Sequence, residues 1–233
     1  SARMAEHRGL IEREGVVCSV EDMVRHVRSS DLASRARELL GLDAETPLYD
    51  ISDGVDKSHT AAYEPIADEL LRQLPEAGVD PAGITLVVPM GCGDLILGIS
   101  SALDRWPRRP RLVAATVPEN PLACLGGQWP SSSPFELRTV AHGLATPQTV
   151  FEGALRELSA SRRMQVEVVL DEDIQAFEDR LEHGPFLEPT SSAAFAAARR
   201  LLVAEPDCGP LVVLCSGAGD PGRPYTPLER YRV

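Results

Sequence analysis

Lysine is almost absent from this chain: it occurs once, at Lys57, against 22 arginines. Acidic residues outnumber basic ones by 35 to 23, so the formal net charge is −12. A surface that binds a nucleic-acid backbone needs a concentrated positive patch, whereas the arginines here are scattered among acids. The composition therefore argues against a nucleic-acid partner.

Cysteine is also scarce, with five residues, and none of them forms a C-x-x-C pair or lies at metal-ligand spacing from a histidine. This pattern argues against a zinc site, and we expect no metal. Cys92 is the exception in position, because it lies in a glycine-rich turn where a ligand would reach it. A catalytic thiol at Cys92 is an alternative, but no histidine neighbours it in the sequence to lower its pKa.

Long apolar runs are missing as well. No run approaches the roughly 20 residues that a membrane-spanning helix needs, and the first residues form a charged helical pattern in place of the apolar core of a signal peptide. With 43% hydrophobic and 25% charged residues, the composition is typical of a globular protein. We expect a cytoplasmic protein that does not contact a membrane.

The most distinctive segment that is present runs from 87 to 98 and reads VVPMGCGDLILG. It begins as a buried strand, turns at Gly91 and Gly93, and continues as the start of a helix. Glycine permits a tight turn and leaves backbone N–H groups uncovered at the positive end of a helix, an arrangement that binds phosphate. A strand-to-helix turn without a ligand has the same pattern, so this segment alone does not decide between them.

Two further segments follow it along the chain. Residues 186–198 read FLEPTSSAAFAAA, and residues 211–219 read LVVLCSGAG. Taken in this order, the three segments resemble the C-terminal half of the fold-type II pyridoxal-phosphate enzymes, which form the tryptophan synthase β family. The resemblance covers nearly the whole chain and is closest to the threonine synthase and serine/threonine dehydratase branches.

The resemblance implies a cofactor, pyridoxal 5'-phosphate, and the residues that would bind it. The backbone N–H groups of Gly91, Cys92, Gly93, Asp94 and Leu95 would hold its phosphate. The carboxylate of Asp94 departs from what a dianionic ligand requires. We interpret it as a cap on the following helix, and the alternative is a turn that no longer holds phosphate.

Two more residues match the family's site. Ser216 would face the pyridine nitrogen, where a neutral hydroxyl suits β-elimination and β-replacement. Glu188 would lie beside the ring, although an exposed acid before Pro189 at a helix start explains it equally well.

The lysine that these enzymes carry in an upstream serine-x-lysine motif has no counterpart in this sequence. Lys57 does not match that position, and we interpret it as an exposed lysine near a helix start. The resemblance implies the C-terminal portion or subunit of a pyridoxal-phosphate-dependent lyase or synthase, with no catalytic lysine of its own. It would act by β-elimination or replacement on a hydroxy or O-activated amino acid.

The missing lysine would come from another chain or from a missing N-terminal segment. The expected partners are therefore an amino-acid substrate together with a complementary N-terminal chain, a second copy of this chain, or both. The alternative is a non-catalytic homologue that acts as a structural or regulatory binding subunit.

The order of strand and helix patterns predicts an α/β fold with an open, mostly parallel sheet and helices on both faces. A helical pattern covers 60–74, and Pro65 lies in its early turns. The predicted strands are 84–89, 111–117, 165–170 and 211–215. We expect residues 1–52 to be the remnant of a small α/β domain, and residues 53–233 to form a large domain of the cofactor-binding type.

Overall fold

The computed structural model describes residues 58–126, 139–146, 149–178 and 187–217, together with residues 37, 41 and 43–45. The chain divides into two compact units, Ser1–Ile51 with Val233, and Ser52–Arg232. Nearly all of the described residues belong to the second unit, which is the unit described below. Lys57 lies outside the described residues, and the assignment of residues 1–52 to a small-domain remnant stays a prediction.

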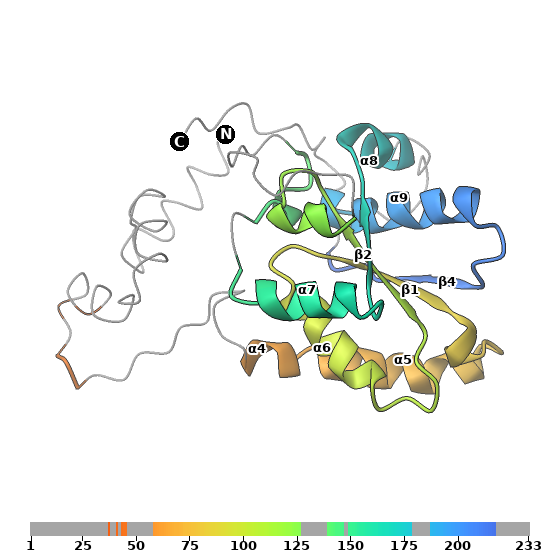
Figure 1. The fold of residues 1–233 in the computed structure, drawn as a ribbon, viewed down its shortest axis with the longest axis horizontal. Helices are drawn as coiled ribbons and strands as arrows, with labels where there is room; N and C mark the ends of the chain where they lie inside the picture. The colour runs from red at the N-terminus through yellow and green to blue at the C-terminus, as the bar shows by residue number, and fades with distance from the viewer. Residues whose placement is uncertain are drawn as a thin grey trace. The chain divides into compact units, whose positions relative to one another are not determined.

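Among its described residues, the second unit contains a parallel sheet of four strands in the order β3-β2-β1-β4 (Figure 1). The strands are β1 (Thr85–Pro89), β2 (Arg111–Thr116), β3 (Gln165–Val168) and β4 (Leu211–Val213). Val87 of β1 pairs with Val113 of β2 on one side and with Val213 of β4 on the other. Every residue of β1 is buried, as its continuous apolar run predicts, whereas β4 forms one edge of this sheet and is half-buried.

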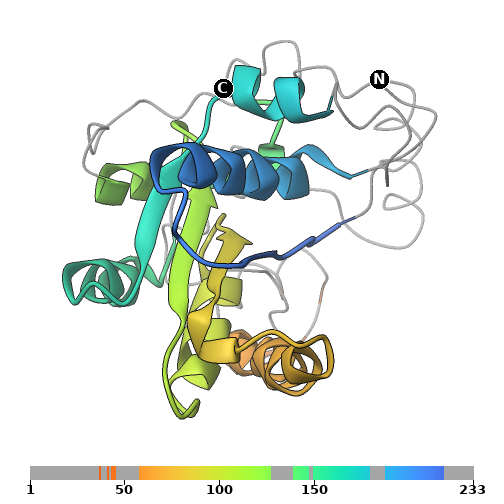
Figure 2. The same cartoon turned by 90° about the vertical axis from the view of Figure 1, so that its right-hand side faces the viewer.

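Helices cover both faces of the sheet, and Figures 1 and 2 show the two layers. The helices are α4 (Ser58–Ala61), α5 (Glu64–Glu76), α6 (Asp94–Leu103), α7 (Glu152–Ala160), α8 (Asp171–Glu178) and α9 (Pro189–Ala204). Leu86 and Val88 pack in one core cluster with α5, α6 and α7, and Val87 between them packs in a second cluster with α8 and α9. Successive strand residues point to opposite faces, so a strand that is buried at every position serves both layers. The predicted α/β fold is confirmed.

The single helix predicted over 60–74 is two helices in the structure. α4 ends at Ala61 and α5 begins at Glu64, with Pro65 in the first turn of α5. Proline is accommodated there because the first N–H groups of a helix have no partner within it. Pro65, which is unfavourable inside a helix, therefore marks the start of the second helix.

The described residues contain neither a helix that could span a membrane nor a cluster of metal ligands. α9 has 16 residues, and no helix in the described ranges is both long and apolar enough to cross a membrane. Within the same ranges, no group of three or more histidine, cysteine, aspartate or glutamate side chains gathers as a metal site.

Candidate functional site

The turn after β1 depends on glycine at two positions. Gly93 has φ +97° and precedes α6, in the left-handed region that other residues enter only at a cost. At Gly91, an added Cβ would overlap the carbonyl oxygen of Gly143. The backbone of residues 142–144 therefore packs directly on the turn, and neither glycine tolerates a side chain without displacement.

The turn presents backbone N–H groups without an acceptor in the part of the chain that the structure describes. Among the described residues, no acceptor is found for the N–H groups of Gly91, Gly93 or Asp94. They lie at the N-terminus of α6, a helix of ten residues whose dipole makes this end positive. Turns of this kind are typical of sites that bind anions. The N–H of Leu95 differs, because it donates to the Oδ1 atom of Asp94 over 2.8 Å.

Asp94 is buried within this turn, with 6% of its surface exposed. Its Oδ1 atom also accepts a hydrogen bond from the Cys92 thiol over 3.1 Å. Its Oδ2 atom is buried and has no hydrogen-bond partner among the described residues. We expected Asp94 to cap the helix. In the structure Gly93 is the N-cap residue and Asp94 is the first residue of α6, although its carboxylate still accepts one N–H of the first turn.

Ser216 and Glu188 meet beyond the end of β4. The Ser216 hydroxyl donates to Oε1 of Glu188 over 3.3 Å, and its oxygen lies 3.5 Å from Oγ of Ser191. Ser191 is fully buried in the first turn of α9, donates to the Gly217 carbonyl and accepts from the Gly217 N–H, both over 3.1 Å. These contacts hold the end of β4 against the start of α9.

The structure brings the glycine turn and the pair formed by Ser216 and Glu188 to the same end of the sheet, where the strands finish. β1 and β4 are adjacent and parallel, and the Leu214 N–H donates to the Val87 carbonyl over 2.9 Å. The Gly91 turn and Ser216 therefore both follow carboxyl ends of neighbouring strands, the usual location of ligands on open α/β sheets. Gly143 links the groups further, because an added Cβ there would lie 2.9 Å from Oγ1 of Thr190 at the start of α9.

Asn120 is a residue of this site that the sequence analysis did not single out. Its buried amide nitrogen donates to the Gly91 carbonyl over 2.9 Å and to the Leu144 carbonyl over 2.7 Å. Its Oδ1 atom accepts the Leu122 N–H over 2.9 Å, so the side chain is fixed in place. Asn120 thus ties the glycine turn to the segment that covers it. The only sequence signal is a polar residue shortly after a buried strand.

His142 was also missed, and it lies in the segment that covers the turn. Its Nδ1 atom is buried and has no hydrogen-bond partner within the described part of the chain. Burial lowers the pKa of His142, and the nearby Asp171 carboxylate opposes that shift. Asp171 is itself engaged, since it accepts from the Thr139 hydroxyl over 2.6 Å and from the Val140 N–H.

His142 should make the stability of the protein depend on pH. Because its pKa is lower in the folded state than its ordinary value of 6.5, the unfolded state binds more protons between the two values. Stability from this group is complete above pH 6.5 and decreases as the pH falls through that value. We expect His142→Gln to reduce the slope of unfolding free energy against pH between about pH 7 and 5, measured by urea unfolding. Equal slopes in both proteins would contradict this assignment.

The family to which the chain belongs follows from its sequence as a whole. The family model for pyridoxal-phosphate dependent enzymes matches residues 14–217. The chain belongs to this family, whose cofactor is pyridoxal phosphate and whose members act on amino acids. No curated protein matches the chain.

Solved structures share the fold. A threonine deaminase from T.th. is 21% identical, with a TM-score of 0.58 over 84% of this chain and 63% of that one. Maize serine racemase is 20% identical, with a TM-score of 0.58 over 82% and 56% of the two chains. An O-ureido-L-serine synthase is 17% identical, with a TM-score of 0.59 over 83% and 56%. In each comparison this chain spans less than two thirds of the other protein's length.

Proposed function

We propose that this chain is the C-terminal portion or subunit of a pyridoxal-phosphate-dependent lyase or synthase. It would act by β-elimination or β-replacement on a hydroxy or O-activated amino acid. The observation that carries the proposal is the glycine turn at the start of α6, with the N–H groups of Gly91, Gly93 and Asp94 unused among the described residues. Ser216 follows the neighbouring strand at the same edge of the sheet.

The described residues fit the phosphate of this cofactor. The N–H groups of Gly91, Cys92, Gly93 and Asp94 would hold it, and the dipole of α6 would add to the attraction. Leu95 would contribute only if its N–H left the Asp94 carboxylate. Gly91, Gly93 and Asp94 have N–H groups available among the described residues, Cys92 stays a prediction, and Leu95 depends on Asp94.

Ser216 and Glu188 would serve the ring of the cofactor. When bound, pyridoxal phosphate supplies an electron sink that stabilises negative charge on the amino acid. Ser216 now donates its only proton to Glu188. To hydrogen-bond an unprotonated pyridine nitrogen, the hydroxyl would turn away from Glu188 and donate to the ring instead. Glu188 would then lie beside the ring, and its Oε1 atom would no longer accept the hydrogen bond from Ser216.

The covalent attachment to lysine would be supplied from outside this chain, by a complementary N-terminal chain or segment. A second copy of this chain is a further expected partner. The described residues include no lysine, and Lys57 does not occupy the family's lysine position in the sequence.

One observation favours a second candidate, a non-catalytic homologue that serves as a structural or regulatory binding subunit. The Asp94 carboxylate is buried in the turn where the phosphate would bind, and its Oδ2 atom has no hydrogen-bond partner among the described residues, although its Oδ1 atom accepts from Cys92 and Leu95. A like charge beside a dianionic ligand weakens binding. The strength of cofactor binding therefore separates the two candidates.

The test is to purify the native assembly, treat it with borohydride in the presence of pyridoxal phosphate, and map the modified lysine by peptide mass. The proposal predicts a phosphopyridoxyl lysine on a peptide that does not belong to this chain, and an assembly heavier than this chain alone. A stoichiometric adduct on Lys57 would contradict it. An assembly with no reducible adduct and no spectral response to hydroxy amino acids would support the non-catalytic homologue.

A further inference from the structure

A hollow lined by arginines lies at the amino ends of the strands, whereas the candidate site lies at their carboxyl ends. Its volume is about 560 Å³, and it is formed where β2 and β3 begin and where α7 ends. Its lining residues include Arg109, Arg111, Arg162 and Arg163. β2 has six residues, so roughly 20 Å of strand separates this hollow from the carboxyl ends of the sheet.

Positive charge exceeds negative charge in this hollow, although the protein as a whole carries −12. The Asp104 carboxylate pairs with both Arg109 and Arg163. Glu205 pairs with Arg111 over 2.5 Å. Two carboxylates thus face four guanidinium groups, which leaves an excess of two positive charges over the carboxylates that form these pairs. The next carboxylate, Glu167, lies near Arg111 and accepts a hydrogen bond from Gln165 over 2.7 Å.

Arg109 is held rigidly at the base of this cluster. One of its terminal nitrogens donates to the Ser100 carbonyl over 2.9 Å, and the other donates to the Ser100 hydroxyl over 2.8 Å. Its Nε atom is buried and has no hydrogen-bond partner among the described residues. Burial lowers the pKa of Arg109, the Asp104 carboxylate opposes that shift, and the positive charge of Arg163 adds to it. The cation is therefore placed where it would gain from an additional anion.

Arg162 contributes the cation that is free to bind. It follows α7 with φ +57°, a left-handed conformation in which glycine is the usual residue. Its side chain makes no hydrogen bond or ion pair with any of the described residues. A residue in the left-handed conformation thus places at the hollow a guanidinium that has no partner among the described residues.

We propose that this hollow binds a phosphate dianion, either inorganic phosphate or the phosphate group of a small metabolite. Guanidinium groups match phosphate oxygens with paired N–H donors. The guanidinium groups outnumber the nearby carboxylates Asp104, Glu205 and Glu167, so the hollow retains positive charge for an anion. The site is separate from the glycine turn and does not depend on the proposed function of that turn.

The proposal can be tested by titrating the protein with inorganic phosphate and following backbone amides by ¹H–¹⁵N NMR. We expect saturable shifts in residues 109, 111, 112 and 159–165, independent of any shifts in residues 91–95. Arg162→Gly should weaken phosphate binding in the arginine hollow by about tenfold or more, because a charged hydrogen-bond donor is lost. It should also raise the melting temperature, because glycine adopts the left-handed conformation freely. A loss of binding with a gain in stability cannot be attributed to misfolding.

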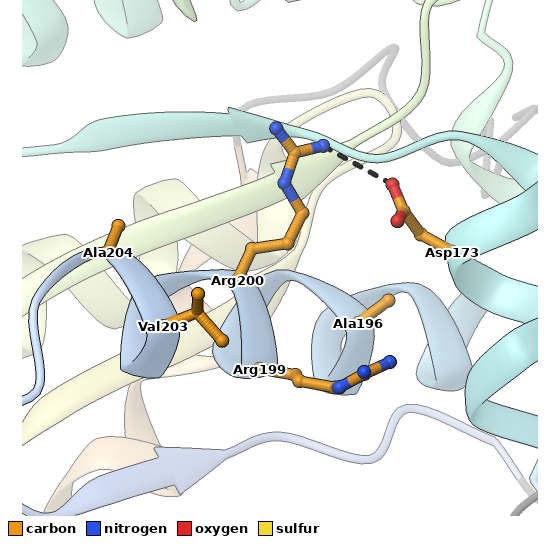
Figure 3. A pocket seen from close by; sticks show the side chains of 6 residues that line it. All are labelled: Asp173, Ala196, Arg199, Arg200, Val203 and Ala204. Atoms are coloured by element: carbon orange, nitrogen blue, oxygen red, sulfur yellow. Dashed lines mark hydrogen bonds and ion pairs between the residues drawn. The ribbon is translucent and has the colours of Figure 1, made fainter.

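Arg199→Gln provides the matched control. Arg199 lines a different hollow between α8 and α9, of about 320 Å³, in which Arg200 pairs with Asp173 over 3.3 Å (Figure 3). The control removes one positive charge and should leave phosphate binding in the arginine hollow unchanged. Equal weakening in both variants, or no saturable shift in residues 159–165, would overturn the proposal. Glycerol 3-phosphate, titrated in parallel, identifies a metabolite as the ligand if it binds more tightly and free phosphate if it does not.

Discussion

Gly91→Ala is expected to weaken binding of pyridoxal phosphate strongly and to destabilise the fold. The added Cβ would overlap the Gly143 carbonyl oxygen and lie 3.3 Å from Oγ1 of Thr146. Because the closest atom belongs to the backbone, the turn or its covering segment must shift. Overpacking of this kind costs about 1 to 3 kcal/mol. Urea unfolding at a constant m value measures that cost, and a fluorescence titration with pyridoxal phosphate measures the affinity.

Gly153→Ala is the control for this prediction. Gly153 lies in the first turn of α7, and an added Cβ there meets no atom within 4 Å. Alanine favours the helix over glycine by up to about 1 kcal/mol, so this variant should be neutral or more stable and should bind the cofactor normally. Equal stabilities in the two variants would contradict the tight packing of Gly143 on the turn.

Asp94→Asn is expected to strengthen binding of pyridoxal phosphate by about tenfold or more, through removal of a like charge next to the phosphate. Asparagine keeps an oxygen that can accept the Leu95 N–H, which Asp94 Oδ1 accepts over 2.8 Å. The variant therefore changes charge while it preserves the start of α6. A titration with pyridoxal phosphate at two salt concentrations measures the effect, which should depend only weakly on salt because Asp94 is buried.

Asp207→Asn serves as the control, because it removes the same charge from an exposed residue beyond the end of α9. Its affinity for the cofactor should match that of the unaltered protein. If Asp94→Asn weakened binding instead, the carboxylate would have to interact favourably with the cofactor or with a group that accompanies it.

The sequence was sufficient to predict those structural features that depend on local patterns. The continuous apolar run over 84–89 predicted a strand covered on both faces, and β1 is buried at each position. Glycine at 93 predicted a turn, and Gly93 has the left-handed conformation that such turns require. These features depend on the conformational range of single residues and on short-range periodicity.

Other features depend on contacts between distant segments, which periodicity does not encode. Asn120 bonds to the Gly91 carbonyl, 29 residues away, and Gly143 packs on both Gly91 and Thr190. The helix α7 was not predicted, although Leu155 and Leu158 bury its inner face. The placement of Ser216 near the turn followed from family resemblance, and the pairing of β1 with β4 gives it a physical basis.

The position of β4 implies that Ser216 is held less rigidly than the glycine turn. The glycine turn continues from β1, which has a neighbouring strand on each side, whereas Ser216 continues from β4, which is short, half-buried and the edge strand among the strands that the structure describes. Local opening of an edge strand costs less free energy than opening of a central one. Fluctuations that release Ser216 from the sheet would therefore leave the anion-binding turn intact, so the ring contact would be the adjustable part of the site and the phosphate contact the permanent one.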